Sequence, residues 1–177
     1  MVRRERRWLH GGLLAVAAAV LLQLLGQVPA AAAPRVLYYD ASRAAEFVSV
    51  VHEGAAAWNN TVSNVRLMPV PAGVRANIVV TADDAWPRAI TTSLGNGRWI
   101  MGRQAVRDGH YPPRIASHEF GHLLGLPDRR TGLCVDLMSG SSAGTACRSV
   151  LPNAAERRRV DTLFQSAATV RPAAFID

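Results

Sequence analysis

The chain has 177 residues, of which 20 are basic and 13 are acidic, so its formal net charge is +7 at pH 7. All the basic residues are arginines, and four of them lie within the first seven residues. Without residues 1–33, 16 arginines and 12 acidic residues remain, which is a net charge of +4. Because so much of the excess charge lies at one end, the composition does not indicate a nucleic-acid-binding protein.

The N-terminal segment has the order of parts found in a secretory signal peptide. Its basic start is followed by an uncharged stretch from Trp8 to Pro34, with an apolar centre at 13–25 and small residues at 29–33. This pattern predicts a signal peptide over residues 1–33, and therefore a secreted, extracellular protein without a membrane contact after cleavage. The alternative is retention of residues 9–28 as an anchor, although a spanning helix needs ~20 apolar residues.

Residues 34–177 are expected to form a single domain, because about 144 residues are enough for one apolar core. We expect this domain to be a monomer. Its two cysteines, Cys134 and Cys147, are expected to form a disulfide bond in an oxidising compartment; the alternative is two free thiols.

In chain order, the first half of the domain is predicted to contain a strand, a long helix and four more strands. Apolar residues spaced three and four apart predict the helix over 43–58. Gly95, Asn96 and Gly97 indicate a hairpin between the last two strands. The predicted strands are 36–39, 65–70, 76–81, 88–94 and 98–101.

The second half is predicted to contain two helices joined by an irregular segment. Pro112 and Pro113 can begin a helix that continues to Leu124 and ends at Gly125. Residues 126–152 are rich in glycine, serine and proline and are expected to be irregular. Asn153, followed three residues later by Glu156, indicates the start of a final helix. The predicted fold class is therefore α+β, with a small irregular C-terminal part that ends in a helix.

Two histidines in the first of these helices have the spacing of metal ligands. His118 and His122 are four residues apart, so they lie on one face of a helix and can reach one metal ion. Glu119 is displaced by about 100° around the helix from His118. It would border the metal without joining the two ligands, which is the position expected for a general base. The alternative is a helix with two unrelated histidines.

A catalytic zinc site has three protein ligands and an open fourth position. Gly125 can adopt the left-handed conformation that reverses the chain, which would turn Asp128 toward the same metal. Two alternatives are an ordinary turn role for Asp128 and a third ligand at Glu156. Glu156 is the only glutamate after Glu119, and it lies 34 residues beyond His122.

The segment from His118 to Asp128, followed by Leu137-Met138-Ser139-Gly140, resembles the metzincin pattern HExxHxxGxxD with a Met-turn. An aspartate as the last of these residues is characteristic of the snapalysin family, small secreted bacterial neutral metalloproteases. The likeness extends from about Val36 to the last helix.

This resemblance implies a metzincin-like zincin fold with a mixed twisted sheet, a long helix and an active-site helix. It implies that zinc is bound by His118, His122 and Asp128, with Glu119 as the catalytic base and acid. Met138 would form the apolar floor beneath the metal, and Cys134 would pair with Cys147. Members of the family cleave proteins and favour an aromatic residue just after the scissile bond.

The sequence departs from the family pattern at two places. The family's calcium-binding aspartate and threonine are matched here by Tyr111 and Pro113, so calcium binding is left open. A tyrosine two residues after the aspartate ligand is matched by Arg130. If an additional group must donate a hydrogen bond to the transition state, Arg130, Tyr111 and His110 are the candidates.

The resulting hypothesis is a secreted zinc endopeptidase whose substrates are proteins or peptides. The substrate is expected to lie extended along an exposed strand edge at residues 89–93. The alternative is a non-catalytic binding module, secreted or tethered to a membrane, in which zinc is structural. Trp86 and Trp99 could line a substrate cleft, but burial in the core is the preferred prediction for both.

Overall fold

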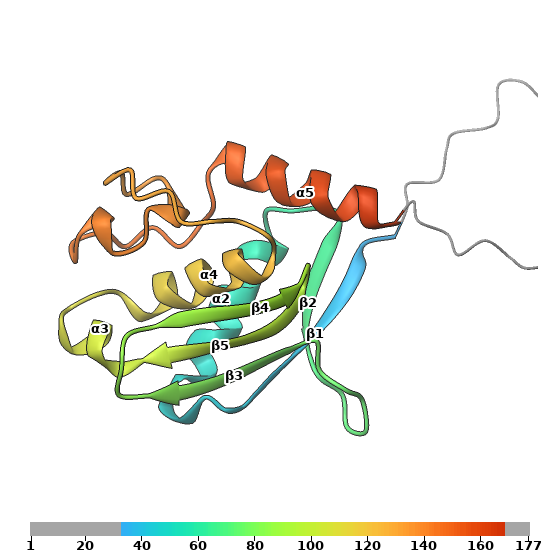
Figure 1. Ribbon diagram of the computed structural model, residues 1–177, viewed down its shortest axis with the longest axis horizontal. Helices are drawn as coiled ribbons and strands as arrows, with labels where there is room; N and C mark the ends of the chain where they lie inside the picture. The colour runs from blue at the N-terminus through green and yellow to red at the C-terminus, as the bar shows by residue number, and fades with distance from the viewer. Residues whose placement is uncertain (1–32, 169–177) are drawn as a thin grey trace, which may run out of the picture. The chain divides into compact units, whose positions relative to one another are not determined.

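A five-stranded mixed sheet forms the framework of the fold, which we describe from a computed structural model (Figure 1). The described residues are 33–168. The predicted signal peptide therefore falls, apart from residue 33, outside the described residues. Within 33–168, none of the helices has the length and hydrophobicity needed to cross a membrane.

The strands are arranged in the order β2-β1-β3-β5-β4. β2 and β4 are therefore the edge strands of this sheet. β4 is antiparallel to β5, whereas all other neighbouring strands are parallel. The strands are β1 (Arg35–Arg43), β2 (Val65–Pro69), β3 (Ile78–Asp83), β4 (Arg88–Ser93) and β5 (Asn96–Gly102).

The three predicted helices are present, and the structure adds two short helical elements that were not predicted. The long helices are α2 (Val48–Asn59), α4 (Pro112–Leu123) and α5 (Ala154–Ala168). The short elements are η1 (Ala45–Phe47), α3 (Arg103–Arg107) and η2 (Leu137–Ala143). The predicted helix over 43–58 is thus a 3-10 turn followed by α2. The α3 turn was not predicted, because five residues are too few to show helical periodicity.

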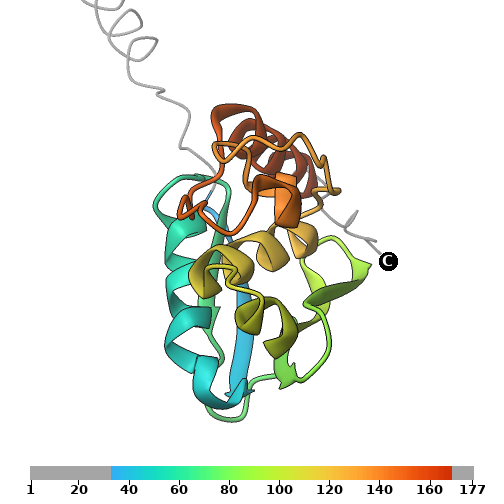
Figure 2. The same cartoon turned by 90° about the vertical axis from the view of Figure 1, so that its left-hand side faces the viewer.

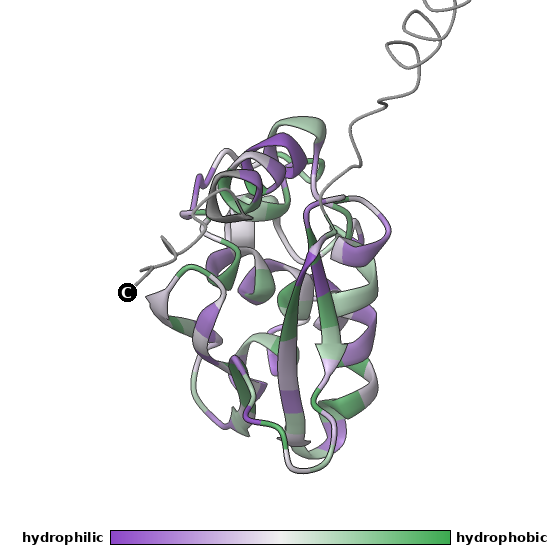
Figure 3. Cartoon of the chain, turned by 90° about the vertical axis from the view of Figure 1, so that its right-hand side faces the viewer, coloured by the Kyte–Doolittle hydropathy of each residue, from purple (hydrophilic) through white to green (hydrophobic). Residues whose placement is uncertain are grey.

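Alternation of buried and exposed side chains fixes which face of the sheet is covered. In β1, the side chains of Leu37, Tyr39 and Ala41 are buried and their neighbours are not. Figure 3 likewise shows hydrophilic and hydrophobic residues mixed along the strands. The buried side chains belong to one core cluster, which also includes Phe120 and Phe164 from two helices.

Helices α2 and α4 pack against each other beside the sheet (Figure 2). Their backbones come close at Gly54, where a Cβ atom would lie 2.8 Å from the Cβ of Ala116. The indole of Trp58 in α2 donates a hydrogen bond to the carbonyl of Ser117 in α4, at 2.8 Å. This contact attaches α4 to the core directly before His118.

The last helix begins with the predicted cap. The side chain of Asn153 accepts hydrogen bonds from the backbone N–H groups of Ala155 and Glu156, and Glu156 accepts one from the N–H of Asn153. This reciprocal arrangement satisfies N–H groups that have no partner within the helix. The architecture confirms the predicted α+β class with its mixed twisted sheet, and its irregular part that ends in a helix.

Candidate metal centre and active-site pocket

The helix α4 places His118 and His122 on one face, one turn apart. Pro112 and Pro113 occupy the first turn, where the missing N–H groups cost no helical hydrogen bond. After Leu123 the chain reverses at Gly125, whose φ of +92° is accessible to glycine at little cost. The reversal returns the chain toward the histidines and carries Asp128 with it.

Three potential ligand atoms meet at this position. The Nε2 atoms of His118 and His122 are 3.1 Å apart. Asp128 Oδ1 lies 3.2 Å from the Nε2 of His118 and 3.6 Å from that of His122. Within residues 33–168, these are the residues whose ligand atoms come close enough to hold one metal ion.

Both imidazoles are oriented from behind by backbone carbonyls. His118 Nδ1 lies 3.0 Å from the oxygen of Leu137, and His122 Nδ1 lies 2.8 Å from the oxygen of Leu126. Since a carbonyl can only accept, each Nδ1 carries a proton, so in the neutral imidazole the lone pair of each Nε2 faces the site. Two imidazoles and a carboxylate, held this way, are a donor set that fits zinc with one position left open.

The segment η2 passes close to the ligand residues. Gly140 is so close to them that an added Cβ would lie 3.2 Å from His118 Cε1 and 3.7 Å from Asp128 Oδ1. The fully buried Met138 packs under α4, where a Cβ on Gly121 would lie 2.6 Å from its sulfur. The side chain of Met138 thus lies next to the turn of α4 that carries His122.

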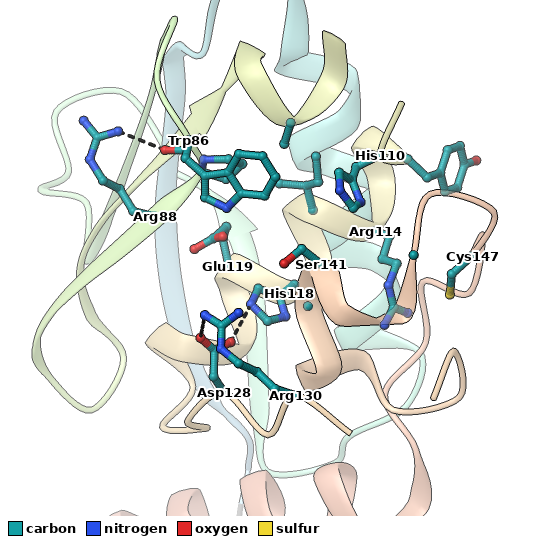
Figure 4. Close-up of a pocket in the computed structure, with 16 residues that line it drawn as sticks. Trp86, Arg88, His110, Arg114, His118, Glu119, Asp128, Arg130, Ser141 and Cys147 are labelled. Carbon is teal, nitrogen blue, oxygen red and sulfur yellow. Dashed lines mark hydrogen bonds and ion pairs between the residues drawn. The ribbon is translucent and has the colours of Figure 1, made fainter. Parts of the chain in front are cut away.

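Glu119 lines a pocket that is also lined by the ligand residues His118 and Asp128 (Figure 4). Only 4% of the residue is exposed, and its Oε2 has no hydrogen-bond partner among the described residues. Burial raises the pKa of Glu119 to about 7, against an opposing effect of His118. A buried carboxyl group with an unpaired oxygen and a pKa near neutrality can both accept and donate a proton.

Burial and contact between the ligand side chains shift their pKa values. The hydrogen bond with His118 lowers the pKa of Asp128 to about 2, so Asp128 is ionised at neutral pH. Burial alone would lower the pKa of His118, but its contacts with Asp128 and Glu119 outweigh that effect and raise it. Burial and the nearby charge of His118 lower the pKa of His122.

The pocket has a volume of about 210 Å³. Its lining includes an apolar wall, formed by Trp86, Ala105 and Ile115. Trp86 is 40% exposed, and its ring meets His110 edge to face at 5.6 Å. The prediction of a core position was right for Trp99 and wrong for Trp86. Nothing in the local sequence distinguishes the two, because the segment before β4 that carries Trp86 has no periodicity.

The three candidates for an additional donor all line this pocket. Arg130 Nη2 is 3.0 Å from Asp128 Oδ2, the oxygen that does not contact the histidines. Arg130 also has a φ of +45°, an unusual conformation for a residue with a Cβ. The guanidinium carbon of Arg148 lies over the ring of Tyr111, 5.2 Å from the ring centre.

The exposed strand edge predicted at residues 89–93 is present. Residues 89–93 lie in the edge strand β4, whose side chains are mostly exposed. The strand contacts α4, and Thr91 approaches the carbonyl of His122 with its hydroxyl at 3.4 Å. An extended chain added to β4 would therefore lie beside the helix that carries the two histidines.

The predicted disulfide between Cys134 and Cys147 is confirmed, with the two Cα atoms 5.5 Å apart. Sequence reasoning did not single out Arg114, a buried arginine at the edge of the pocket. Its position one helical turn before His118 was the available signal. Tyr111 and Pro113, at the positions where the resemblance places calcium ligands, offer no side-chain carboxylate.

Comparison with known proteins identifies the family. Residues 34–167 match the Streptomyces extracellular neutral proteinase (M7) family. The chain belongs to this family. The resemblance inferred from the zinc motif and the Met-turn is therefore confirmed, and with it the metzincin-like fold.

Curated relatives are similar over most of the chain. The extracellular small neutral protease of Streptomyces lividans is 38% identical over 136 residues, which are 77% of this chain and 60% of the relative. That of Streptomyces coelicolor is 38% identical over 140 residues, 75% of this chain and 63% of the relative. The protease of Streptomyces caespitosus is 35% identical over 127 residues, 71% of this chain and 94% of the relative. The chain thus spans about 60% of the length of the first two.

Proposed function

We propose that the protein is a secreted zinc-dependent endopeptidase that hydrolyses peptide bonds in proteins. The observation that carries the proposal is the convergence of three ligand atoms beside Glu119, whose buried oxygen has no partner among the described residues. Family membership and the names of the relatives, all extracellular proteases, support it.

His118, His122 and Asp128 are the residues that would hold the zinc ion. When bound, zinc supplies Lewis-acid chemistry: it polarises a carbonyl group and lowers the pKa of water toward ~7. The carbonyls of Leu137 and Leu126 keep the two imidazoles turned toward the ion. Met138 forms the apolar floor of the site and packs against α4 at Gly121.

Glu119 moves the proton in this proposal. It accepts a proton from the attacking water and delivers it to the amine that leaves. Its burial suits both steps, because it keeps the carboxylate from being stabilised by bulk water and so holds its pKa near the working pH.

The substrate lies along β4 and reaches the adjacent pocket with one side chain. Pairing with an edge strand satisfies the peptide backbone without requiring a sequence. The apolar wall formed by Trp86, Ala105 and Ile115 would favour an aromatic residue after the scissile bond. Residues 34–177 form the single protease domain and residues 1–33 the signal peptide. We propose a monomer with no nucleic-acid partner.

The proposal is tested with the purified protein loaded with one equivalent of zinc and assayed on casein and on a peptide library. We expect activity that a chelator removes and zinc restores. Glu119→Gln should lower the rate by at least about 100-fold, the lower end for loss of a general base, and retain zinc. Glu53→Gln, which removes an exposed carboxylate from α2, is the control and should be fully active.

Zinc binding without proteolysis would instead favour a non-catalytic module with a structural zinc. Cleavage without a preference for aromatic residues would contradict only the proposed role of the pocket wall. N-terminal sequencing of exported protein tests the signal peptide against a retained membrane anchor.

A further inference from the structure

Two buried charged side chains meet at one short stretch of backbone, Leu137–Met138. Arg114 is 6% exposed and Glu156 is 3% exposed. They come from different helices, α4 and α5, and neither has a part in the proposed proton transfer. Burying a charge is costly unless it is hydrogen-bonded, so their contacts must explain their position.

Arg114 contacts four backbone carbonyls of the irregular segment. Its Nη1 donates to Cys134 at 3.2 Å and Ser149 at 2.7 Å, and its Nη2 to Asp136 at 2.7 Å and Leu137 at 3.3 Å. These carbonyls belong to parts of the chain on both sides of η2. The guanidinium therefore holds the disulfide loop and the start of η2 against α4.

Glu156 contacts the opposite side of the same stretch. Its Oε2 accepts from the N–H of Leu137 at 3.2 Å and its Oε1 from the N–H of Met138 at 2.8 Å. The carboxylate also accepts the N–H of Asn153 at the start of α5. A glutamate in a helical cap needs only the last of these bonds, so the other two are additional to capping.

The stretch held between these charges contacts the metal ligands. The carbonyl of Leu137 accepts both from Arg114 and from His118 Nδ1. The carbonyl of Met138 accepts from the N–H of Arg129 at 2.8 Å, next to Asp128. The position of this backbone therefore influences the direction of one imidazole and the approach of the carboxylate ligand.

We propose that Arg114 and Glu156 are positioning residues for the metal site, which act by fixing the Leu137–Met138 backbone behind His118 and Asp128. The inference rests on the proposed function, because it assumes that these ligands hold zinc. A merely structural role is the competing explanation, in which loss of either side chain lowers stability but leaves the folded site unchanged.

The test uses the purified full protein, with zinc affinity measured by chelator competition well below the unfolding transition. Glu156→Gln keeps the shape but places an NH₂ group against a backbone N–H. Arg114→Lys keeps the charge but replaces the five N–H donors with a single ammonium. Since partners that orient metal ligands typically change affinity by 10 to 100-fold, we expect zinc to bind about 10-fold more weakly to each variant.

Asp161→Asn is the matched control, because Asp161 lies on the same helix and also accepts two backbone N–H groups, those of Ser63 and Asn64. It should lose stability and keep the zinc affinity of the unaltered protein within about twofold. The absorption spectrum of the cobalt-substituted protein gives a second readout, and its visible bands should change in both test variants but not in the control. The double variant should be less than additive, since both changes act on one backbone stretch.

Unchanged affinity and cobalt spectra in Glu156→Gln and Arg114→Lys would overturn the inference, whereas absence of zinc binding in the unaltered protein would overturn the proposed function. If neither variant folds, hydrogen exchange in the unaltered protein decides. Amides of Leu137 and Met138 that exchange as slowly as those of α4 support the inference. Exchange as fast as in the surrounding irregular segment contradicts it.

Discussion

The sheet region and the irregular segment of the domain are held in place by different means. The sheet with α2 and α4 is stabilised by backbone ladders and by one apolar core. The irregular segment, residues 126–152, contains only the short η2 and is held by a disulfide and by side chains that bond its backbone. In the sheet region many apolar contacts and backbone hydrogen bonds act together, whereas in the irregular segment a few polar atoms supplement the burial of Leu126, Leu137 and Met138 in the core.

The candidate metal site lies where these two regions meet. The helix α4 contributes His118, Glu119 and His122, whereas the irregular segment contributes Asp128 and the floor at Met138. We therefore expect changes in the sheet to affect stability more than zinc binding, and changes in the irregular segment to affect both.

The largest effect on stability is expected from truncation in the sheet. Leu67 is 1% exposed in β2, the strand at the far edge from β4. Leu67→Ala should lower the free energy of unfolding by about 3 to 4 kcal/mol in urea titration, because buried leucines cost this much when a cavity remains. Zinc affinity of the folded variant should be unchanged. Met68→Ala, at the exposed neighbouring position, is the control with little expected effect.

Removal of the disulfide should lower the free energy of unfolding somewhat less than Leu67→Ala does. It should also weaken zinc binding. Replacing both Cys134 and Cys147 with serine should cost about 3 kcal/mol, the value for a loop of this length. Zinc affinity should also fall, since the carbonyl of Cys134 is one of the acceptors that hold Arg114. An unaltered affinity would show that the irregular segment keeps its position without the bond.

A smaller stability effect but a clear effect on zinc binding is expected at Gly140. Its φ of +59° and ψ of −138° suit glycine alone, and a Cβ would press on His118. Gly140→Ala should cost about 1 to 3 kcal/mol and weaken zinc binding about 10-fold, as measured by chelator competition. Gly132→Ala is the matched control, because Gly132 also has a positive φ, +76°, but its Cβ would contact no ligand. Equal zinc affinities of the two variants would contradict this prediction.

The smallest effect is expected from an exposed ion pair beside the sheet. Arg103 makes two contacts with Glu46 and lowers the pKa of that carboxyl from 4.5 to about 2. The pair therefore contributes stability above pH 4.5, and this contribution is lost as the pH falls toward 2. Between these values the stability of Glu46→Gln should depend less on pH than that of the unaltered protein. Parallel profiles would show that the pair contributes nothing.

The sequence predicted most elements because their signals are local. Helical spacing identified α2, two prolines and a glycine marked the ends of α4, and Gly95–Gly97 indicated the hairpin of β4 and β5, which pair antiparallel as expected. The strand order was not predicted. β2 and β3 follow each other in the chain, yet each pairs with β1, one on either side. Parallel pairing between distant segments leaves no pattern within either of them.

The sequence by itself determined the chemistry of the candidate site. The four-residue spacing of His118 and His122, the glutamate between them and the glycine turn before Asp128 depend only on helix geometry and on the backbone freedom of one residue. Only the tertiary structure decided what surrounds these groups. It placed Trp86 at the pocket wall and brought Arg114 and Glu156 to the backbone of Leu137. These contacts involve an irregular segment, which has no periodic pattern from which they could be predicted.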